Sequence, residues 1–404
     1  MNQKLEFKIN GLSDILGVFE KHQKSVRLIG GCVRDAIIGK AFSDIDIATP
    51  LSPDQVTEIF KNAGFKVIPT GIDFGTVTVL SKGNNFEITT LRKDISTDGR
   101  HAVVEYTDDY EVDAARRDFT INALSYDPFE EKIYDYFNGL EDLKNSVVKF
   151  IGIPKERIEE DYLRIMRFFR FSAFYAKVLD DESLEACKAN MQGLEKISSE
   201  RIHQELYKMF QCNKPIATCL SAMQESNLFK VIAPSYNFDL TDILKLESNI
   251  EAYKNIELGI RKTRLALLTV ALGKKGAKDF MKELKFSNSD ISANDVILGF
   301  MIALKQHEKK EDIVFEICSL WYYFHSYINT CLVIAQSFGK INSSEMLDNI
   351  SYMKQAAPRM PISSEELMAA GYEGLSLGIR IKYLEKQWIK SGFSVEKDKL
   401  MGLK

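Results

Sequence analysis

The spacing of apolar residues changes near residue 150, and this change limits the possible folds most strongly. Before it, short runs such as Val26–Ile29 and Phe86–Leu91 have strand-like composition and are separated by glycine-containing turns. After it, apolar residues recur at helical spacing, beginning with Pro154–Ala176. The sequence therefore predicts an α+β protein, with a small mixed β-sheet and helices in an N-terminal head and an all-α neck, body and tail after it.

The elements of the head follow from local patterns. An apolar run leads into Gly30-Gly31, and helical spacing follows it. Further on, two β-rich runs flank the turn signal Lys82-Gly83-Asn84-Asn85, which predicts a hairpin. The expected elements are a strand at Val26–Ile29, a helix at Cys32–Ile38, a strand at Asp44–Ala48, a helix at Pro53–Ala63, hairpin strands at Thr76–Leu80 and Phe86–Leu91, and a polar loop at Arg92–His101.

Length and composition are those of a folded protein with several domains. At about 150 residues per domain, a chain of 404 residues corresponds to two or three domains. We expect a head over residues 1–145, a neck over 146–213, and a body with a tail over 214–404. Hydrophobic residues make up 45% and charged residues 27%, which excludes a disordered, collagen-like or disulfide-stapled chain.

The charge balance restricts how the chain can bind nucleic acid. A formal net charge of −4 excludes a uniformly basic surface, so a nucleic-acid partner must meet a local basic patch. Residues 261–285 hold eight Lys or Arg and two acidic residues, a net charge of +6. This stretch either follows an RNA backbone or is an ordinary solvated helical face, and the sequence leaves both interpretations open.

Cysteine usage and the N-terminus bear on the compartment. None of the six cysteines forms a C-x-x-C pair, which favours reduced thiols in a cytosolic protein. The N-terminal sequence MNQKLEFKIN lacks the apolar region of a signal peptide, and no apolar run is long enough to span a bilayer. We expect a cytoplasmic protein that does not bind membranes, and nothing indicates an obligate protein partner.

Two acidic residues separated by one position suggest a metal site. Asp44 and Asp46 fall on an expected strand, where successive side chains alternate, so both carboxylates share one face. Mg²⁺ prefers one or two carboxylates completed by water and phosphate oxygens. The alternative is a pair of solvated surface aspartates. Glu87, on the second hairpin strand, is either a further carboxylate of this site or an outward-facing strand residue.

A glycine pair upstream of these carboxylates suggests a phosphate site. Gly30-Gly31 lies where a strand enters a helix, and glycines let backbone N–H groups approach phosphate closely. Arg34 falls in the first helical turn, within reach of a triphosphate. A lone Gly-Gly pair is usually a simple turn. Here the pair is not isolated, because Asp44 and Asp46 follow it in the chain.

Four motifs in this order resemble those of one enzyme family. They are Leu28–Asp35 with Ser43–Thr49, then Arg116–Leu124, Glu160–Arg167 and Ser199–Leu206. Together they resemble the motifs of the class II CCA-adding enzymes, which are tRNA nucleotidyltransferases and share their family with bacterial poly(A) polymerases. The resemblance covers residues 28–210 and is looser beyond them.

The resemblance implies metal-dependent nucleotidyl transfer. Asp44 and Asp46 would hold Mg²⁺, with one ion activating the RNA 3′-hydroxyl and another holding the triphosphate. Glu87 carries over as the third catalytic carboxylate. Arg116 either contacts the nucleotide or only pairs with Asp118. The nucleotide contacts that carry over in this part of the chain are Gly30, Gly31, Arg34 and Arg117.

A second group of charged residues recurs every three positions on an expected helix: Asp161, Arg164, Arg167 and Arg170. A solvated charged stripe has the same spacing. A carboxylate can accept the exocyclic amine of cytosine or adenine while a guanidinium donates to the ring nitrogen, whereas guanine and uracil present the opposite groups. In the resembled family Asp161 and Arg164 select the base in this way, and the further arginines contact the nucleotide.

The resemblance also implies a flexible loop and a reaction. Residues 93–104 match the family's flexible loop, which here contains Asp98 and Arg100 and is full length. This length favours complete CCA or A-only addition over CC-only addition. The expected reaction is template-independent addition or repair of the 3′-CCA of tRNA from CTP and ATP, with release of pyrophosphate. The alternatives are an A-adding enzyme or poly(A) polymerase of the same family, and a catalytically silent RNA-binding protein.

Overall fold

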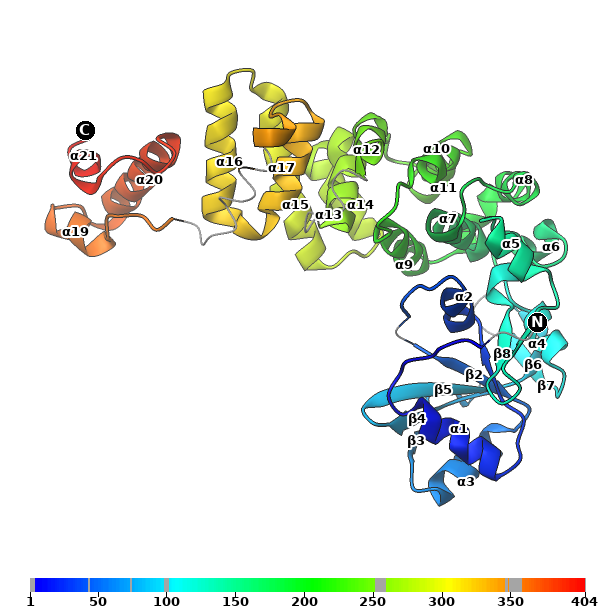
Figure 1. Cartoon of the computed structure of the whole chain (residues 1–404). Coiled ribbons are helices and arrows are strands. Elements are labelled where there is room, and N and C mark those ends of the chain that lie inside the picture. Colours follow the sequence, from blue (N-terminus) through cyan, green and yellow to red (C-terminus); the bar gives the residue numbers. More distant parts are fainter. Residues whose placement is uncertain are drawn as a thin grey trace. The chain divides into compact units, whose positions relative to one another are not determined.

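The protein is described here by a computed structural model that covers residues 4–42, 44–72, 75–97, 102–250, 259–345, 348 and 358–403. The chain forms two compact units, Met1–Arg201 and Ile202–Lys404 (Figure 1). Every described strand lies in the first unit, and the described elements of the second unit are helices. The predicted α+β class, with a strand-containing head and a helical remainder, is confirmed.

The first unit is built on a seven-stranded mixed sheet with strand order β3-β4-β5-β2-β1-β8-β9. Neighbouring strands are antiparallel except β2 and β5, which run parallel. The strands are β1 (Arg27–Ile29), β2 (Asp46–Thr49), β3 (Lys66–Ile68), β4 (Thr76–Ser81), β5 (Asn84–Thr90), β8 (Ser125–Asp127) and β9 (Lys132–Tyr134). The parallel pair positions the site, because it aligns Asp46 with Glu87.

Local sequence explains the hairpin and the helices beside it. Lys82 and Gly83 have φ angles of 46° and 83°, the positive values that a two-residue type I′ turn between β4 and β5 requires. α1 (Leu12–Lys21) and α3 (Pro53–Asn62) pack together against the sheet, where the ring centroids of Phe19 and Phe60 lie 5.4 Å apart. Figure 1 shows α2 (Gly31–Ile37) on the other side of the sheet.

One loop prediction and one strand boundary need correction. The segment Arg92–His101, expected as a loop, begins with β6 (Arg92–Thr97), which pairs with β7 (Ala102–Tyr106) in a separate two-stranded sheet. The β6 sequence RKDIST lacks an apolar alternation, so its pairing with β7 and not its own pattern makes it a strand. β2 begins at Asp46, not at Asp44. The loop residues Asp98 and Arg100 lie outside the described residues.

The single helix predicted over Pro154–Ala176 is two helices. α6 (Pro154–Glu160) ends before Asp161, and α7 begins at Leu163 and runs to Tyr175. Asp161 is extended, with φ −153° and ψ 104°, and its Oδ1 accepts the N–H of Leu163 across 3.1 Å. A short carboxylate side chain that bonds the nearby backbone competes with continued helix. The first unit also contains α4 (Tyr110–Ala115), α5 (Gly139–Lys144), α8 (Asp181–Ala189) and the first residues of α9 (Ser199–Phe210).

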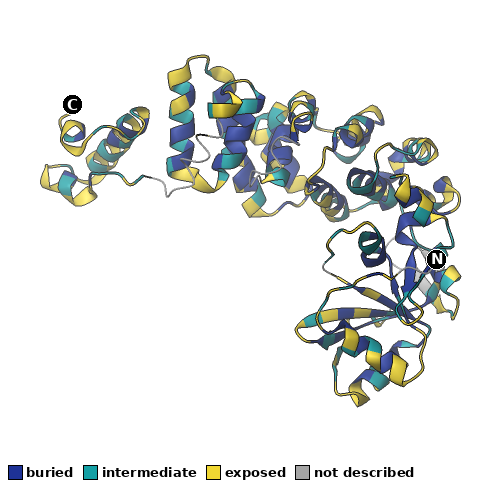
Figure 2. Ribbon diagram, viewed as in Figure 1, coloured by how far each residue is buried: buried dark blue, intermediate teal, exposed yellow. Residues whose placement is uncertain are grey.

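The second unit is a series of packed helices and a small C-terminal cluster. In α17, residues 331–335 have no exposed surface, and Figure 2 shows the buried side of the helices around it. No helix in the described part of the chain is long and apolar enough to cross a membrane. The helices are α10 (Ala217–Glu225), α11 (Leu228–Ile232), α12 (Thr241–Glu247), α13 (Ile260–Thr269), α14 (Gly273–Glu283), α15 (Asn288–Gln306), α16 (Lys310–Phe324), α17 (Ile328–Ser337), α19 (Ser364–Ala369), α20 (Gly374–Lys390) and α21 (Lys397–Met401).

One member of the basic stretch 261–285 belongs to the core. Arg264 has no exposed surface, and it donates to both carboxylate oxygens of Glu247 across 2.6 and 2.9 Å. It also donates to the carbonyl oxygens of Phe210 and Lys214 across 3.1 and 2.8 Å. Arg264 therefore joins the segment after α9 to α12 and α13 and is unable to contact RNA.

Candidate active site

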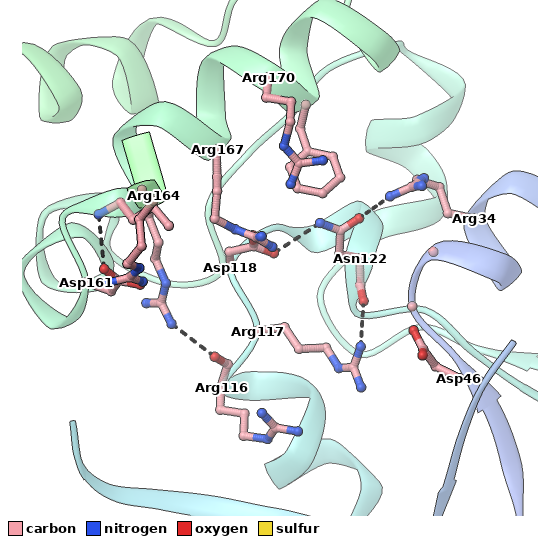
Figure 3. Close-up of a pocket in the computed structure, with 15 residues that line it drawn as sticks. Arg34, Asp46, Arg116, Arg117, Asp118, Asn122, Asp161, Arg164, Arg167 and Arg170 are labelled. Atoms are coloured by element: carbon pink, nitrogen blue, oxygen red, sulfur yellow. Dashed lines mark hydrogen bonds and ion pairs between the residues drawn. The ribbon is translucent and has the colours of Figure 1, made fainter. Parts of the chain in front are cut away.

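A cavity of about 530 Å³ lies in the first unit, between the sheet and α7 (Figure 3). Seven arginines and three aspartates line it, which gives a formal charge of +4 and favours an anionic ligand. The lining residues are Gly30, Gly31, Arg34, Asp46, Arg116, Arg117, Asp118, Asn122, Asp161, Leu163, Arg164, Arg167, Arg170, Phe171 and Arg201.

Three acidic residues lie in or next to the paired strands β2 and β5. Asp46 is the first residue of β2 and Asp44 lies just before the strand; both are exposed and Ile45 between them is buried, so the predicted alternation of exposed and buried residues is present. Asp46 is in register with Glu87 on the parallel strand β5, and aligned residues of paired strands point to the same face. Asp46 lines the cavity, whereas Asp44 and Glu87 are not among its lining residues.

The donor chemistry at this edge fits a hard divalent cation. Although part of the Asp46 side chain is exposed, the surrounding protein desolvates its carboxylate and raises its pKa. The Arg117 guanidinium lowers this pKa and the Asp44 carboxylate raises it, and the net shift is upward. A cation beside this carboxylate would favour its charged form. Within the described ranges, no three His, Cys, Asp or Glu side chains form a ready-made metal site. The acidic residues fit a divalent cation that is held by carboxylates and completed by ligand oxygens.

Glycine is required at position 30 for two reasons: the backbone angle is one that other residues rarely adopt, and a side chain would crowd Arg117. Its φ angle is 72°, and a Cβ atom there would lie 2.9 Å from Nη1 of Arg117. Its N–H donates to the carbonyl oxygen of Leu124 across 3.0 Å, so this amide is not the phosphate donor that a glycine pair suggests. Gly31 and Arg34 also line the cavity.

One buried carboxylate holds both arginines at the end of α4. Nε of Arg116 donates to Asp113 across 2.9 Å, and Nη2 of Arg117 donates to the same carboxylate across 3.3 Å. The alternative that Arg116 pairs with Asp118 is therefore wrong. Burial alone would raise the pKa of Asp113, but the two guanidinium groups outweigh burial and hold this pKa below its ordinary value.

Asp118 pairs with a different arginine. Its Oδ2 accepts Nε of Arg167 across 2.7 Å, and its Oδ1 accepts Nδ2 of Asn122 across 3.0 Å. The side-chain oxygen of Asn122 accepts from Arg34, and its backbone carbonyl accepts Nη1 of Arg117 across 3.3 Å. Asn122 thus contacts two of the arginines that line the cavity, Arg34 and Arg117, and is linked to Arg167 through Asp118, as Figure 3 shows.

The opposite end of the cavity holds Asp161 and Arg164. Oδ2 of Asp161 accepts Nη2 of Arg201 across 2.7 Å. Nη1 of Arg164 donates to Glu160 across 2.6 Å and to the carbonyl oxygen of Arg157 across 2.8 Å. Asp161 and Arg164 are brought together at the break between α6 and α7, and not along one continuous helix.

The remaining predicted arginines lie further along α7. Arg167 and Arg170 both line the cavity, and their guanidinium carbons lie 5.3 and 4.1 Å from the ring centre of Phe171. Sequence reasoning gave no role to Asn122 or Arg201, although both lie inside motifs that it singled out. Asp113 lies outside every motif, so no sequence signal identified it.

Two family models match separate parts of the chain. Residues 26–149 match the family model of the Poly A polymerase head domain, and residues 178–240 match the model described as the probable RNA and SrmB-binding site of polymerase A. The human CCA tRNA nucleotidyltransferase 1, mitochondrial, is 33% identical to this chain and covers 97% of it, and the chain covers 89% of that protein. The chain belongs to the CCA tRNA nucleotidyltransferase family.

Other members of this nucleotidyltransferase family are also similar to this chain in sequence or in structure. The CCA-adding enzyme of Ligilactobacillus salivarius is 33% identical over 84% of this chain and 80% of its own length. A crystal structure of the Bacillus stearothermophilus CCA-adding enzyme in complex with CTP superimposes with a TM-score of 0.74 and 25% identity, covering 96% of this chain and 95% of that one. The Thermotoga maritima CCA-adding enzyme complexed with tRNA shares the fold, with a TM-score of 0.69, 18% identity and coverage of 95% and 91%. The predicted family is confirmed.

Proposed function

We propose that this nucleotidyltransferase adds or repairs the 3′-CCA of tRNA from CTP and ATP and releases pyrophosphate. The observation that carries this proposal is a single cavity with two chemically different ends (Figure 3). One end has Asp46 and Arg34, which suit a metal-bound triphosphate, and the other has Asp161 and Arg164, which suit the edge of a base. Named relatives that bind CTP and tRNA support the same substrates.

The carboxylate end would hold the cation and the attacking group. Asp44 and Asp46 would bind Mg²⁺, and Glu87 is the third catalytic carboxylate. When bound, the cation supplies Lewis-acid polarisation of the phosphoryl group and lowers the pKa of the RNA 3′-hydroxyl. The chain's own part here is to present oxygen donors on one face of paired strands, so that little reorganisation is needed.

The arginine-lined centre would hold the phosphates. Gly30 and Gly31 leave room for a close approach, while Arg34 and Arg117 supply donors whose positions are already fixed by Asn122. Arg167 and Arg170 continue the positive lining toward the base. Transfer of a nucleotidyl group depends mainly on such positioning and charge stabilisation.

The Asp161–Arg164 end would select the base without a nucleic-acid template. Asp161 accepts an exocyclic amine, and Arg164 donates to the neighbouring ring nitrogen of cytosine or adenine. Three of the five N–H groups of Arg164 already donate to the carboxylate of Glu160 and to the backbone carbonyl oxygens of Arg157 and Arg116. These bonds fix the plane of the Arg164 guanidinium. Guanine and uracil would leave these polar groups mispaired, at about 1–3 kcal/mol per group.

Three further assignments belong to the same proposal. Residues 1–145 form the catalytic head, 146–213 the nucleotide-selecting neck, and 214–404 the tRNA-binding body and tail. The loop with Asp98 and Arg100 takes part in the change from C to A. The protein acts in the cytoplasm; since the human relative is named as mitochondrial, cell fractionation is the appropriate test.

Extension of tRNA that lacks CCA tests the reaction. With CTP alone we expect two residues to be added, and with CTP and ATP the complete CCA. An A-adding enzyme would leave this substrate unchanged with CTP alone, and a poly(A) polymerase would add a run of A with ATP. A catalytically silent RNA-binding protein would add nothing.

A further inference from the structure

The C-terminal end of α7 is fastened to α2 by polar contacts outside the cavity. The hydroxyl of Tyr175, the last residue of α7, donates to Oδ1 of Asp35 on α2 across 2.9 Å. Nζ of Lys40, just after α2, donates to the carbonyl oxygen of Phe174 across 3.2 Å and lies 4.2 Å from the ring centre of Tyr175. The helix with the base-end arginines is thus tied to the helix that carries Arg34.

Arg34 lies at the centre of these contacts. Its Nε and Nη2 each donate to an oxygen of Asp35 across 3.0 Å, and its guanidinium carbon lies 4.0 Å from the ring centre of Tyr175. Its Nη1 donates to Asn122. These bonds use three of the five N–H groups and fix the guanidinium plane. Among the described residues, this leaves one N–H on each Nη atom for a ligand.

We propose that Asp35 and Tyr175 are positioning residues that hold Arg34 in the orientation in which its two remaining N–H groups meet the triphosphate. This inference rests on the proposed function, because it needs a nucleoside triphosphate in the cavity. A loose arginine loses side-chain freedom when it binds a ligand, whereas one already paired with a carboxylate and stacked on a ring has lost that freedom beforehand.

Two features make the effect specific to the phosphate end. Neither Asp35 nor Tyr175 lines the cavity, whereas Arg34, which contacts both of them, does, so Arg34 is their direct link to a bound nucleotide. Burial raises the pKa of Tyr175, so its hydroxyl stays a proton donor to Asp35 at neutral pH. A change at Tyr175 should therefore alter contacts to the β- and γ-phosphates more than contacts to the base.

The test compares equilibrium binding of CTP and CMP, each with Mg²⁺, to wild-type protein and to Tyr175→Phe, which keeps the ring and removes the hydroxyl. We expect affinity for CTP to fall about three- to tenfold and affinity for CMP to stay unchanged. Asp35→Asn should give the same selective pattern. Tyr236→Phe is the matched control, because Tyr236 also donates to a carboxylate, Glu283, across 2.6 Å but lies in the second unit.

A double-mutant cycle identifies Arg34 as the group acted on. In an Arg34→Gln background, Tyr175→Phe should cause no further loss of CTP affinity. The inference is overturned if Tyr175→Phe binds CTP like the wild type, if CTP and CMP affinities fall equally, or if the loss persists without Arg34. Wild-type protein that bound CTP no tighter than CMP would overturn the proposed function, and this inference with it.

Discussion

Nη2 of Arg201 donates to Oδ2 of Asp161 across 2.7 Å, although forty positions separate the two residues in the chain. The other oxygen of Asp161 accepts the N–H of Leu163, so the carboxylate is held from two sides. Arg201 itself lines the cavity. It belongs to the end of the site that would read the base, and it fixes the direction in which Asp161 accepts a hydrogen bond.

Replacement of Arg201 by Ala should weaken base selection. Without this partner Asp161 can turn away from a mismatched carbonyl, so uracil loses part of its penalty relative to cytosine. We expect the ratio of UMP to CMP incorporation to rise about five- to tenfold, because only part of a charged hydrogen bond worth about 1.5–3 kcal/mol bears on the choice between the two bases. Competition assays with mixed CTP and UTP measure this ratio. An unchanged ratio in Arg201→Ala would remove Arg201 from base selection.

Removal of the carboxylate itself should have a larger effect. Asp161→Ala removes the carboxylate that would accept a hydrogen bond from an exocyclic amine. It also removes the repulsion between that carboxylate and a carbonyl oxygen of the wrong base. We expect choice among the four nucleoside triphosphates to relax by about 10- to 100-fold in the same assay. Asp181→Ala, an exposed aspartate at the start of α8, is the control and should select normally. Wild-type selectivity in Asp161→Ala would contradict the assigned role.

Alanine substitutions at two glycines distinguish the effect of backbone strain from the effect of crowding in the site. Gly30 and Gly39 both have positive φ angles, 72° and 66°, but an added Cβ would lie 2.9 Å from Arg117 only at Gly30; at Gly39 it would meet no described atom within 4 Å. Gly39→Ala should lower the free energy of unfolding by about 1–2 kcal/mol. Gly30→Ala should lower it by at least as much, because its ψ of −128° places it in a region that residues with a Cβ rarely adopt. Only Gly30→Ala should also weaken CTP binding, measured by titration. Equal CTP affinity in the two variants would show that the close approach to Arg117 is unimportant.

Stability should depend on pH through Asp118. Burial would raise its pKa, but Arg167 and the donors Asn122 and the N–H of Phe119 outweigh burial, so the pKa lies below the ordinary 3.8. A carboxylate with a lowered native pKa stabilises the fold above the pKa of the unfolded chain, and this stability is lost as pH falls through the native value. The free energy of unfolding should therefore decrease below about pH 4.

Urea unfolding of the wild type and Asp118→Asn at several pH values checks this dependence. The variant should be less stable than the wild type near neutral pH, because Arg167 loses a charged partner. The difference between the two proteins should shrink in acid. A difference that stays constant with pH would mean that ionisation of Asp118 does not stabilise the fold.

What the sequence predicted well depends on neighbouring positions. The alternation of Asp44, Ile45 and Asp46 predicts two exposed acidic residues on either side of a buried one, and the structure agrees, although β2 itself begins only at Asp46. The turn at Lys82-Gly83 likewise predicted the hairpin correctly, because a two-residue turn has its own chemistry. Such features need no knowledge of distant parts of the chain.

The features that sequence reasoning missed depend on distant partners. The three-residue spacing from Asp161 predicted a continuous helix, but a side-chain bond to Leu163 interrupts it. The basic character of Arg264 suggested a solvent-exposed or RNA-facing residue. In the structure Arg264 is buried in the core, where it pairs with Glu247. Partner choice of this kind is fixed by tertiary packing, which residue spacing does not reveal.

The most direct test of the account is the activity of Asp46→Asn, which keeps the size of the side chain and removes its charge. Single-turnover addition of C to tRNA lacking CCA should slow by at least about 1,000-fold, since loss of the carboxylate that we propose binds the metal would remove several kcal/mol of transition-state stabilisation. Asp54→Asn, an exposed aspartate in the first turn of α3, should react like the wild type. Full incorporation by Asp46→Asn would contradict the central claim.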